Sequence, residues 1–342
     1  MKKEKNNMNP RFSIIMPLFN KEPYIAKALG SVCSQTYPNW ELVIVNDGST
    51  DNSLSVVKLE ISKKNKDIQN KISVIDQENS GVAAARNRGV KESNGEYVCF
   101  LDADDWWEKE FLEEIDKLIK DYPDAGLYAT NYVYYKPGKT RVALKLQRGY
   151  INYPEAYMKS TMMPVTSITT CMPRMVFDKM GGFPVGIKLG EDFLLWAKTA
   201  VHYKVAFCEK ALAYYNNDVP SSLRATRNLH APAHNMLFNL QPLKAEIEKT
   251  LKIEDRRLKN DVRKAEWKAM LDKLRVSGLM EYWLSKEYHE AAAVELEKVD
   301  WAKQPKSQIC IYKTPILILK MKRGFMRIGS FWKQKLLKMC YV

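Results

Sequence analysis

Short apolar runs alternate with helical patterns over the first hundred residues of the chain. Runs with the length of a buried strand lie at residues 12–17, 41–45, 72–75 and 97–101. After the first run, apolar residues recur at helical spacing at Ile25, Ala28, Leu29 and Val32. Residues 81–90 are rich in alanine and predict a second helix, with Gly95 beyond its end. This alternation predicts the α/β fold class, with a doubly wound, mostly parallel sheet.

Acidic residues follow two of the predicted strands. Asp102, Asp104 and Asp105 come directly after the fourth run, and Asp47 ends the second. Open α/β sheets bind ligands at the carboxyl ends of their strands, where an acid after the second strand commonly contacts a nucleoside. The alternative for Asp47 is a plain turn, because Asn-Asp-Gly-Ser has strong turn chemistry.

The three carboxylates at Asp102, Asp104 and Asp105 occupy four successive positions. Unpaired carboxylates this close repel one another and raise each other's pKa. A hard divalent cation such as Mg²⁺ or Mn²⁺ relieves that repulsion, because carboxylate oxygens are its preferred ligands. The alternative is a solvated acidic turn that caps a helix beginning near Glu108.

Composition indicates a globular chain that can bury a sizeable core. Of its 342 residues, 46% are hydrophobic. Six scattered cysteines form no Cys-x-x-Cys pair, which favours reduced core residues of a cytosolic protein. Residues 1–10 are polar and lysine-rich, so we expect a flexible terminus and no signal peptide. No apolar run reaches the roughly 18 residues of a membrane-spanning helix, and the sequence has neither Gly-x-Gly-x-x-Gly after the first strand nor a P-loop.

The net charge of +14 comes mainly from residues 301–342, which contain ten Lys or Arg and no acid. The rest of the chain has 44 basic and 40 acidic residues, so we expect no nucleic-acid partner. Aromatic and aliphatic residues lie between the basic residues of this tail, a pattern that suits an anionic membrane surface. A packed basic helix and nonspecific phosphate binding are the alternatives.

Five short motifs occur in order along the chain, at residues 16–20, 45–51, 79–87, 101–105 and 181–192. They read Met-Pro-Leu-Phe-Asn, Val-Asn-Asp-Gly-Ser-Thr-Asp, Asn-Ser-Gly followed by Ala-Arg-Asn, Leu-Asp-Ala-Asp-Asp, and Gly-Gly-Phe followed by Gly-Glu-Asp. Each motif is weak alone, but the set resembles the inverting family 2 glycosyltransferases over roughly residues 11–220. The resemblance implies a GT-A fold, with a Rossmann-like nucleotide-binding domain, and a UDP-sugar donor.

The resemblance also implies roles for the first three motifs. Pro17, Asn20 and Asp47 would hold the uracil and ribose of the UDP-sugar, and Arg86 would lie near the nucleotide.

The acidic motif would bind the ribose and the metal that bridges the diphosphate. Asp104 is expected to contact the metal or the ribose, Asp105 the metal, and Asp102 to support them.

In the fifth motif the resemblance implies a general base. Asp192 is the expected base on the acceptor hydroxyl, with Glu191 as its neighbour or substitute. A sugar hydroxyl is a weak nucleophile at neutral pH, so a carboxylate must take its proton as it attacks the anomeric carbon. The same acids also suit the first turn of a helix over the following apolar residues, and the two roles are compatible.

Two departures from the family pattern concern the metal and processivity. Where many members have a His or Arg that helps bind metal or diphosphate, Asn217 or Asp218 would substitute as a ligand, or Arg224 or Arg227 would neutralise phosphate. The third metal ligand is therefore open. The Gln-x-x-Arg-Trp motif of processive synthases is absent, so we expect one sugar per encounter.

These patterns predict four parts: a terminus at 1–10, a GT-A domain at 11–228, a helical extension at 229–300 and the basic tail at 301–342. The extension reads as two or three amphipathic helices. They would cover the sheet domain, or they would serve acceptor binding or self-association into a homo-oligomer.

The predicted function is hexosyl or N-acetylhexosaminyl transfer to a glycan or lipid-linked oligosaccharide acceptor, in surface polysaccharide synthesis. The enzyme would be cytoplasmic and peripheral on the inner face of the membrane. One alternative is a sugar-1-phosphate nucleotidyltransferase, although residues 16–21 lack the Gly-rich basic loop that it needs. The other is a non-catalytic, basic protein that binds the membrane peripherally.

Overall fold

The computed structural model describes residues 11–160, 162–220, 235–253, 257–283 and 289–300. The tail at 301–342, the terminus at 1–10, and Arg224 and Arg227 therefore lie outside the described residues. The chain divides into two compact units, one of residues 1–228 with 241–250 and one of residues 229–240 with 251–342. Each unit is described by itself.

The strands of the first unit are β1 (Phe12–Leu18), β2 (Trp40–Asp47), β3 (Ile72–Gln77), β4 (Tyr97–Phe100), β5 (Trp106–Trp107), β6 (Ala125–Tyr135), β7 (Arg141–Val142), β8 (Gly149–Ile151), β9 (Thr170–Pro173) and β10 (Lys204–Asn216). Its helices are α1 (Ile25–Cys33), α2 (Ser53–Ser62), α3 (Lys66–Gln69), α4 (Val82–Lys91), α5 (Phe111–Asp121), α6 (Tyr153–Lys159), the 3₁₀ turn η1 (Ser167–Thr169), α7 (Arg174–Met180), α8 (Glu191–His202) and most of α9 (Gln241–Ile253). The four predicted strands and the two predicted helices, which are α1 and α4, are all present.

One sheet contains all ten strands, in the order β3-β2-β1-β4-β9-β6-β10-β5, with β7 beside β6 and β8 beside β10. The half formed by β3, β2, β1 and β4 is parallel throughout. β9 then pairs antiparallel with both β4 and β6, and β6 pairs parallel with β10. The sheet is therefore mostly parallel and wound in both directions from β1, which confirms the predicted fold class.

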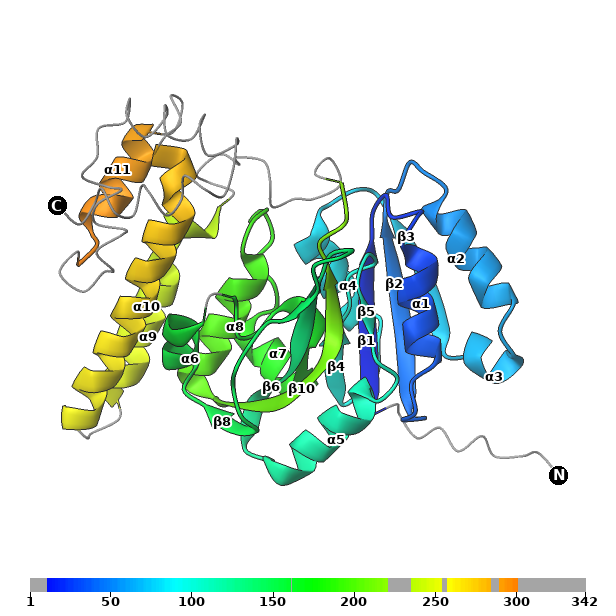
Figure 1. Cartoon of the computed structure of the whole chain (residues 1–342), viewed down its shortest axis with the longest axis horizontal. Coiled ribbons are helices and arrows are strands. Elements are labelled where there is room, and N and C mark those ends of the chain that lie inside the picture. Colours follow the sequence, from blue (N-terminus) through cyan, green and yellow to red (C-terminus); the bar gives the residue numbers. More distant parts are fainter. Residues whose placement is uncertain (1–10, 161, 221–234, 254–256, 284–288, 301–342) are drawn as a thin grey trace. The chain divides into compact units, whose positions relative to one another are not determined.

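Helices cover both faces of the parallel half (Figure 1). Because parallel strands are joined by right-handed crossovers, α1 and α2 lie on one face, and α4, which leads back to β4, lies on the other. The β1 side chains of Phe12, Ile14, Ile15 and Met16 are completely buried between these layers. Such strands need near-continuous apolar runs, which is why the sequence pattern identified them.

α4 packs unusually close to β1 and β2. A Cβ atom added at Gly89 would lie 2.5 Å from Cγ2 of Ile15 and 3.3 Å from Cγ2 of Val45. The glycine thus lets the helix approach the sheet, and this approach brings Arg86, one turn earlier, against the ends of the strands.

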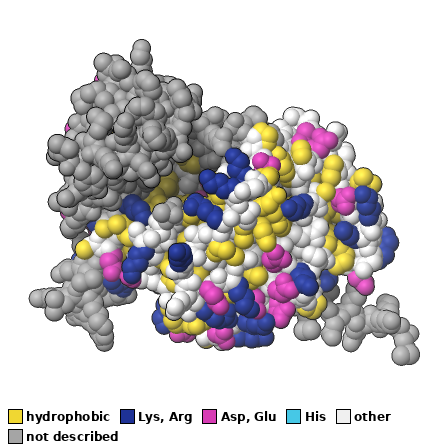
Figure 2. All heavy atoms as spheres, viewed as in Figure 1, with side chains coloured by type: hydrophobic (Ala, Val, Ile, Leu, Met, Phe, Trp, Pro, Cys, Tyr) yellow, Lys and Arg dark blue, Asp and Glu magenta, His cyan; other side chains and the backbone are white. Residues whose placement is uncertain are grey.

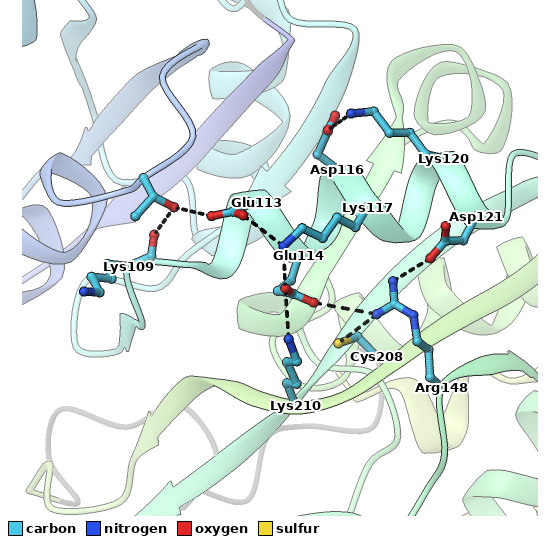
Figure 3. Close-up of polar contacts among 11 residues, drawn as sticks. Lys109, Glu113, Glu114, Asp116, Lys117, Lys120, Asp121, Arg148, Cys208 and Lys210 are labelled. Atoms are coloured by element: carbon cyan, nitrogen blue, oxygen red, sulfur yellow. Dashed lines mark hydrogen bonds and ion pairs between the residues drawn. The ribbon is translucent and has the colours of Figure 1, made fainter.

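Charged contacts hold α5, the helix that follows the acidic motif, against β10 (Figure 3). The buried Glu114 lies 3.0 Å from Nζ of both Lys117 and Lys210, and 3.7 Å from Nη1 of Arg148. Burial would raise the pKa of Glu114, but hydrogen bonds from both lysines outweigh it and place that pKa below its usual range. Gln35, in the loop after α1, accepts from the Leu112 amide and donates to the Glu108 carbonyl, which fixes the beginning of α5.

The second unit contains η5 (Met236–Phe238), α10 (Arg257–Trp283) and α11 (His289–Glu297), and the last residues of α9. α10 and α11 pack side by side around buried Trp267, Met270, Leu274 and Leu296, as the predicted amphipathic pattern requires. Asp272, 1% exposed, accepts from Lys268 and from the Asp300 amide. Within the described residues, no helix is long and apolar enough to cross a membrane.

Cysteines and surface charge in the described residues agree with the sequence. Cys99, Cys171 and Cys208 are buried and all four described cysteines are free thiols. On the face shown in Figure 2, basic and acidic side chains are intermingled over much of the described surface. This distribution fits the near balance of charge outside the tail.

We expect opposite effects from adding one methyl group at two helical glycines. Gly89→Ala should lower the free energy of unfolding by about 1–3 kcal/mol, because overpacking outweighs the gain in helix propensity. Gly30→Ala in α1 is the matched control, since its added Cβ has no atom within 4 Å. It should stabilise by up to about 1 kcal/mol. Urea unfolding measures both values, and equal stabilisation by the two variants would contradict the close packing of α4.

Candidate active site

The predicted site residues come from five segments that end at the carboxyl edge of the parallel strands. Pro17 and Asn20 lie at the end of β1, Asp47 at the end of β2, and residues 102–105 after β4. Arg86 lies in α4, and Glu191 and Asp192 begin α8. Hydrogen bonds and ion pairs connect most of these segments directly.

Asn20 ties the loop after β1 to the loop after β2. It adopts the left-handed conformation (φ 50°), which Asn tolerates better than most residues. Its Oδ1 accepts from the Thr50 amide at 2.8 Å, and its own amide donates to Oγ of Ser49 at 3.1 Å. The two loops predicted to hold the nucleoside are therefore joined by hydrogen bonds into one wall.

Asp47 has a structural role that the sequence did not reveal. Its carboxylate accepts from the amides of Ser80 (2.8 Å) and Gly81 (2.9 Å), and from Nε2 of Gln77 (2.7 Å). The residue is 3% exposed. It thereby closes the turn that leads into α4, and its contact with a nucleoside stays a prediction.

Arg86 connects the acidic motif to the predicted base. Its Nη2 lies 2.7 Å from Oδ1 of Asp102, and its Nη1 lies 2.8 Å from Oε1 of Glu191. The side chain is almost completely buried, and its guanidinium lies 5.1 Å from the centre of the Phe183 ring. Burial would lower the pKa of Arg86, but the negative charges of Asp102, Glu191 and Asp192 outweigh burial and raise that pKa above its ordinary value. The residue is therefore a permanent cation. The sequence placed Arg86 near the nucleotide and missed this bridge.

Asp104 and Asp105 have different surroundings. Nζ of Lys21 lies 2.7 Å from Oδ2 of Asp104, with both side chains less than a fifth exposed. Asp105 is 2% exposed and accepts from the Asn216 amide at the end of β10, at 2.6 Å. Burial raises the pKa of both carboxyl groups, and the charge of Asp104 raises that of Asp105 further.

The sequence predicts a divalent cation at this acidic motif, and the ion stays a prediction. Its oxygen donors are crowded and partly desolvated, and one of them already attracts the ammonium of Lys21. Among the described residues, no three His, Cys, Asp or Glu side chains surround a single point. A Mg²⁺ or Mn²⁺ ion bound by Asp104 and Asp105 would therefore complete its shell with diphosphate oxygens and water, which is common for Mg²⁺.

The two acids at the beginning of α8 differ in exposure, since Glu191 is buried and Asp192 is half-buried. Burial and the charge of Asp192 raise the pKa of Glu191 to about 7, against the opposing effect of Arg86. Burial also raises the pKa of Asp192, again opposed by Arg86. Asp192 accepts from Oγ of Ser167 (3.2 Å) through Oδ2 and from the Phe193 amide (2.7 Å) through Oδ1. A carboxylate with a pKa nearer to neutrality is a better general base.

Three further residues belong to the site: Lys21, Ser167 and Asn216. Lys21 directly follows Asn20 after the end of β1, so its place in the sequence could have indicated a role in the site. Asn216 precedes Asn217, for which the sequence suggests a role as metal ligand. Asn216 itself contributes its backbone amide, which donates to Asp105. Nothing in the sequence around Ser167 indicated its contact with Asp192.

Comparison with known proteins identifies the family. The model described as glycosyl transferase family 2 matches residues 13–180. The glycosyltransferase GlyA of Streptococcus pneumoniae serotype 4 is 33% identical over 222 residues, which are 61% of this chain and 31% of that protein. A Bacillus subtilis glycosyltransferase named for teichuronic acid biosynthesis, TuaG, is 39% identical over 109 residues, 32% of this chain and 41% of that protein.

A solved structure shows the same fold. Residues 1–349 of S. aureus TarS, crystallised with UDP-GlcNAc, superimpose with a TM-score of 0.67 at 21% identity. The match covers 89% of this chain and 84% of that one. Residues 13–180 belong to glycosyl transferase family 2, and the sheet domain that contains them has the GT-A fold. The matched regions span only 31% of the length of GlyA and 41% of the length of TuaG.

We expect Glu191 to make stability depend on pH. Its pKa is about 7 in the folded chain and about 4.3 when unfolded. The folded state thus binds the extra proton, and the stability from this group is present at low pH and lost as pH rises through 7. The free energy of unfolding of wild type minus that of Glu191→Gln should therefore fall by up to about 3 kcal/mol between pH 5 and 8. Parallel urea-unfolding profiles would show that Glu191 has an ordinary pKa.

Proposed function

We propose that this chain is an inverting, metal-dependent glycosyltransferase that moves one sugar per encounter from a UDP-sugar to a glycan or lipid-linked acceptor. The observation that supports this most strongly is the Arg86 bridge, because it joins the acidic motif to the Glu191–Asp192 pair. The family match favours sugar transfer over nucleotidyl transfer and over a purely binding protein.

The donor would occupy the carboxyl edge of the parallel strands. Asn20 and the loops it joins would hold the uracil and ribose, and the diphosphate would lie toward Asp104 and Asp105. A bound Mn²⁺ or Mg²⁺ would supply positive charge that stabilises the diphosphate as it leaves. The TarS complex with UDP-GlcNAc supports a UDP-sugar, and an N-acetylhexosamine is one candidate.

Asp192 would perform the proton transfer. It accepts the proton of the acceptor hydroxyl while the oxygen forms a bond to the anomeric carbon, and the bond between that carbon and the diphosphate oxygen breaks. One displacement of this kind inverts the anomeric centre. Arg86 donates to both Glu191 and Asp102, and Ser167 donates to Asp192. Glu191 and Asp192 would therefore be held in position before the substrate binds.

The relatives suggest the setting of the reaction. TuaG is named for teichuronic acid biosynthesis, which supports a surface polysaccharide as the product. We assign the transfer chemistry to residues 11–228, and we propose that residues 229–300 form a helical extension, although residues 241–250 fall in the same compact unit as the sheet. The basic tail at 301–342 would hold the enzyme peripherally at the inner face of the membrane, near a lipid-linked acceptor.

UDP binding tests the donor site. Calorimetry should detect UDP binding that Mn²⁺ strengthens, and Asp105→Asn should remove most of the metal dependence because it removes a ligand charge. Asp124→Asn, an exposed acid outside the site, is the matched control. If wild type fails to bind UDP with or without Mn²⁺, the proposed donor is wrong.

The role of Asp192 is tested by transfer from a donor sugar that turns over. Asp192→Asn should reduce kcat by about 10²–10⁴-fold, the usual contribution of a general base. UDP affinity should remain within about twofold of wild type, since only the acceptor side changes. Glu191→Gln serves as the comparison variant. If Glu191→Gln loses more transfer than Asp192→Asn, Glu191 is the base instead.

A further inference from the structure

Lys21 already occupies the carboxylate that the proposed function assigns to the metal. Its Nζ lies 2.7 Å from Oδ2 of Asp104, and the two side chains are 16% and 17% exposed. An ammonium and a divalent cation repel each other, so they cannot both lie against the same oxygen without a large cost. A metal ion bound through Oδ2 of Asp104 would therefore displace Lys21.

The backbone of Lys21 is fixed while its side chain is long. Its amide donates to Oγ of Ser53 at 2.8 Å, and the neighbouring amides of Asn20 and Glu22 donate to Ser49 and Asp51. These bonds anchor the residue to the loop after β2. The four-carbon side chain has rotatable bonds, so the ammonium can change its partner while the backbone stays in place.

Lys21 contacts both parts of the proposed donor site. The anchor belongs to the wall predicted to hold the nucleoside, and the present partner Asp104 belongs to the acidic motif. The diphosphate of a UDP-sugar joins these two parts. An ammonium released from Asp104 would therefore be within reach of phosphate oxygens, which lysine binds well as a point charge.

We propose that Lys21 is a positioning residue with two alternating partners. In the donor-free protein it neutralises Asp104, and when a divalent cation and a nucleoside diphosphate bind, it moves to the diphosphate. This inference rests on the proposed function and adds a residue that competes with the metal yet helps to bind the nucleotide.

The exchange gives one substitution two effects of opposite sign. Lys21→Met removes the competing cation, so Mn²⁺ alone should bind more tightly. The same variant removes a phosphate contact, so UDP at saturating Mn²⁺ should bind more weakly. A purely structural role for Lys21 would weaken both.

The test titrates the full chain with MnCl₂ alone and then with UDP at saturating Mn²⁺, by calorimetry. For Lys21→Met we expect Mn²⁺ affinity to rise about threefold to tenfold, as for loss of a partly buried ion pair. We expect UDP affinity to fall about tenfold, as for loss of a charge-assisted hydrogen bond. Thermal unfolding verifies that the variant is folded.

Two controls separate charge from position. Lys58→Met removes the same charge from an exposed position on α2, and it should change neither affinity by more than about twofold because solvent screens distant charges. Lys21→Arg keeps the positive charge and should stay closer to wild type than Lys21→Met in both titrations.

Unchanged or weaker Mn²⁺ binding by Lys21→Met would overturn the proposal. Unchanged UDP binding by this variant, with wild type binding UDP normally, would also overturn it while leaving the proposed function intact. If wild type does not bind UDP at all, the proposed function fails, and the Mn²⁺ titration still decides whether Lys21 competes for Asp104.

Discussion

The site depends on one buried guanidinium. Arg86 lies between Asp102 and Glu191, which come from segments about 90 residues apart in the sequence. A buried arginine without partners would be very costly, and so would the buried Glu191 carboxylate without the arginine. The three groups are therefore stable only together, which fixes the beginning of α8 against the end of β4. The positions of Asp192 and of the acidic motif follow from this constraint.

Several other contacts depend on the same packing. Gly89 lets α4 approach β1 closely enough for Arg86 to reach the strand ends, and Asp47 closes the turn before that helix. The centre of the Phe183 ring lies 5.0 Å from that of Phe100 and 5.5 Å from that of Trp196. This packing secures the segment that leads into α8. The charged groups are thus held by an apolar layer that determines their spacing.

Most of the parallel half of the sheet was predictable because β1, β2 and β4 are buried on both faces and need continuous apolar runs. The second half was harder, since β5, β7 and β9 are too short to form a period, and β10 contains irregularities around Cys208 and Ala211. The motifs identified the acids at the strand ends, but not their partners. Arg86, Lys21 and Ser167 acquire their contacts from residues 16 to 105 positions away, and local sequence carries no record of such pairs.

The antiparallel strand β9 also determines when the site can form. β4 pairs with β1 on one side and with β9, which begins only at Thr170, on the other. Asp105 gains its partner from Asn216, at the end of β10. Pairings so distant in sequence form slowly, because a long loop must close before the contact contributes any energy. During synthesis the contact between the loops after β1 and β2 can form early, whereas the acidic motif is completed only after β10 has emerged and folded.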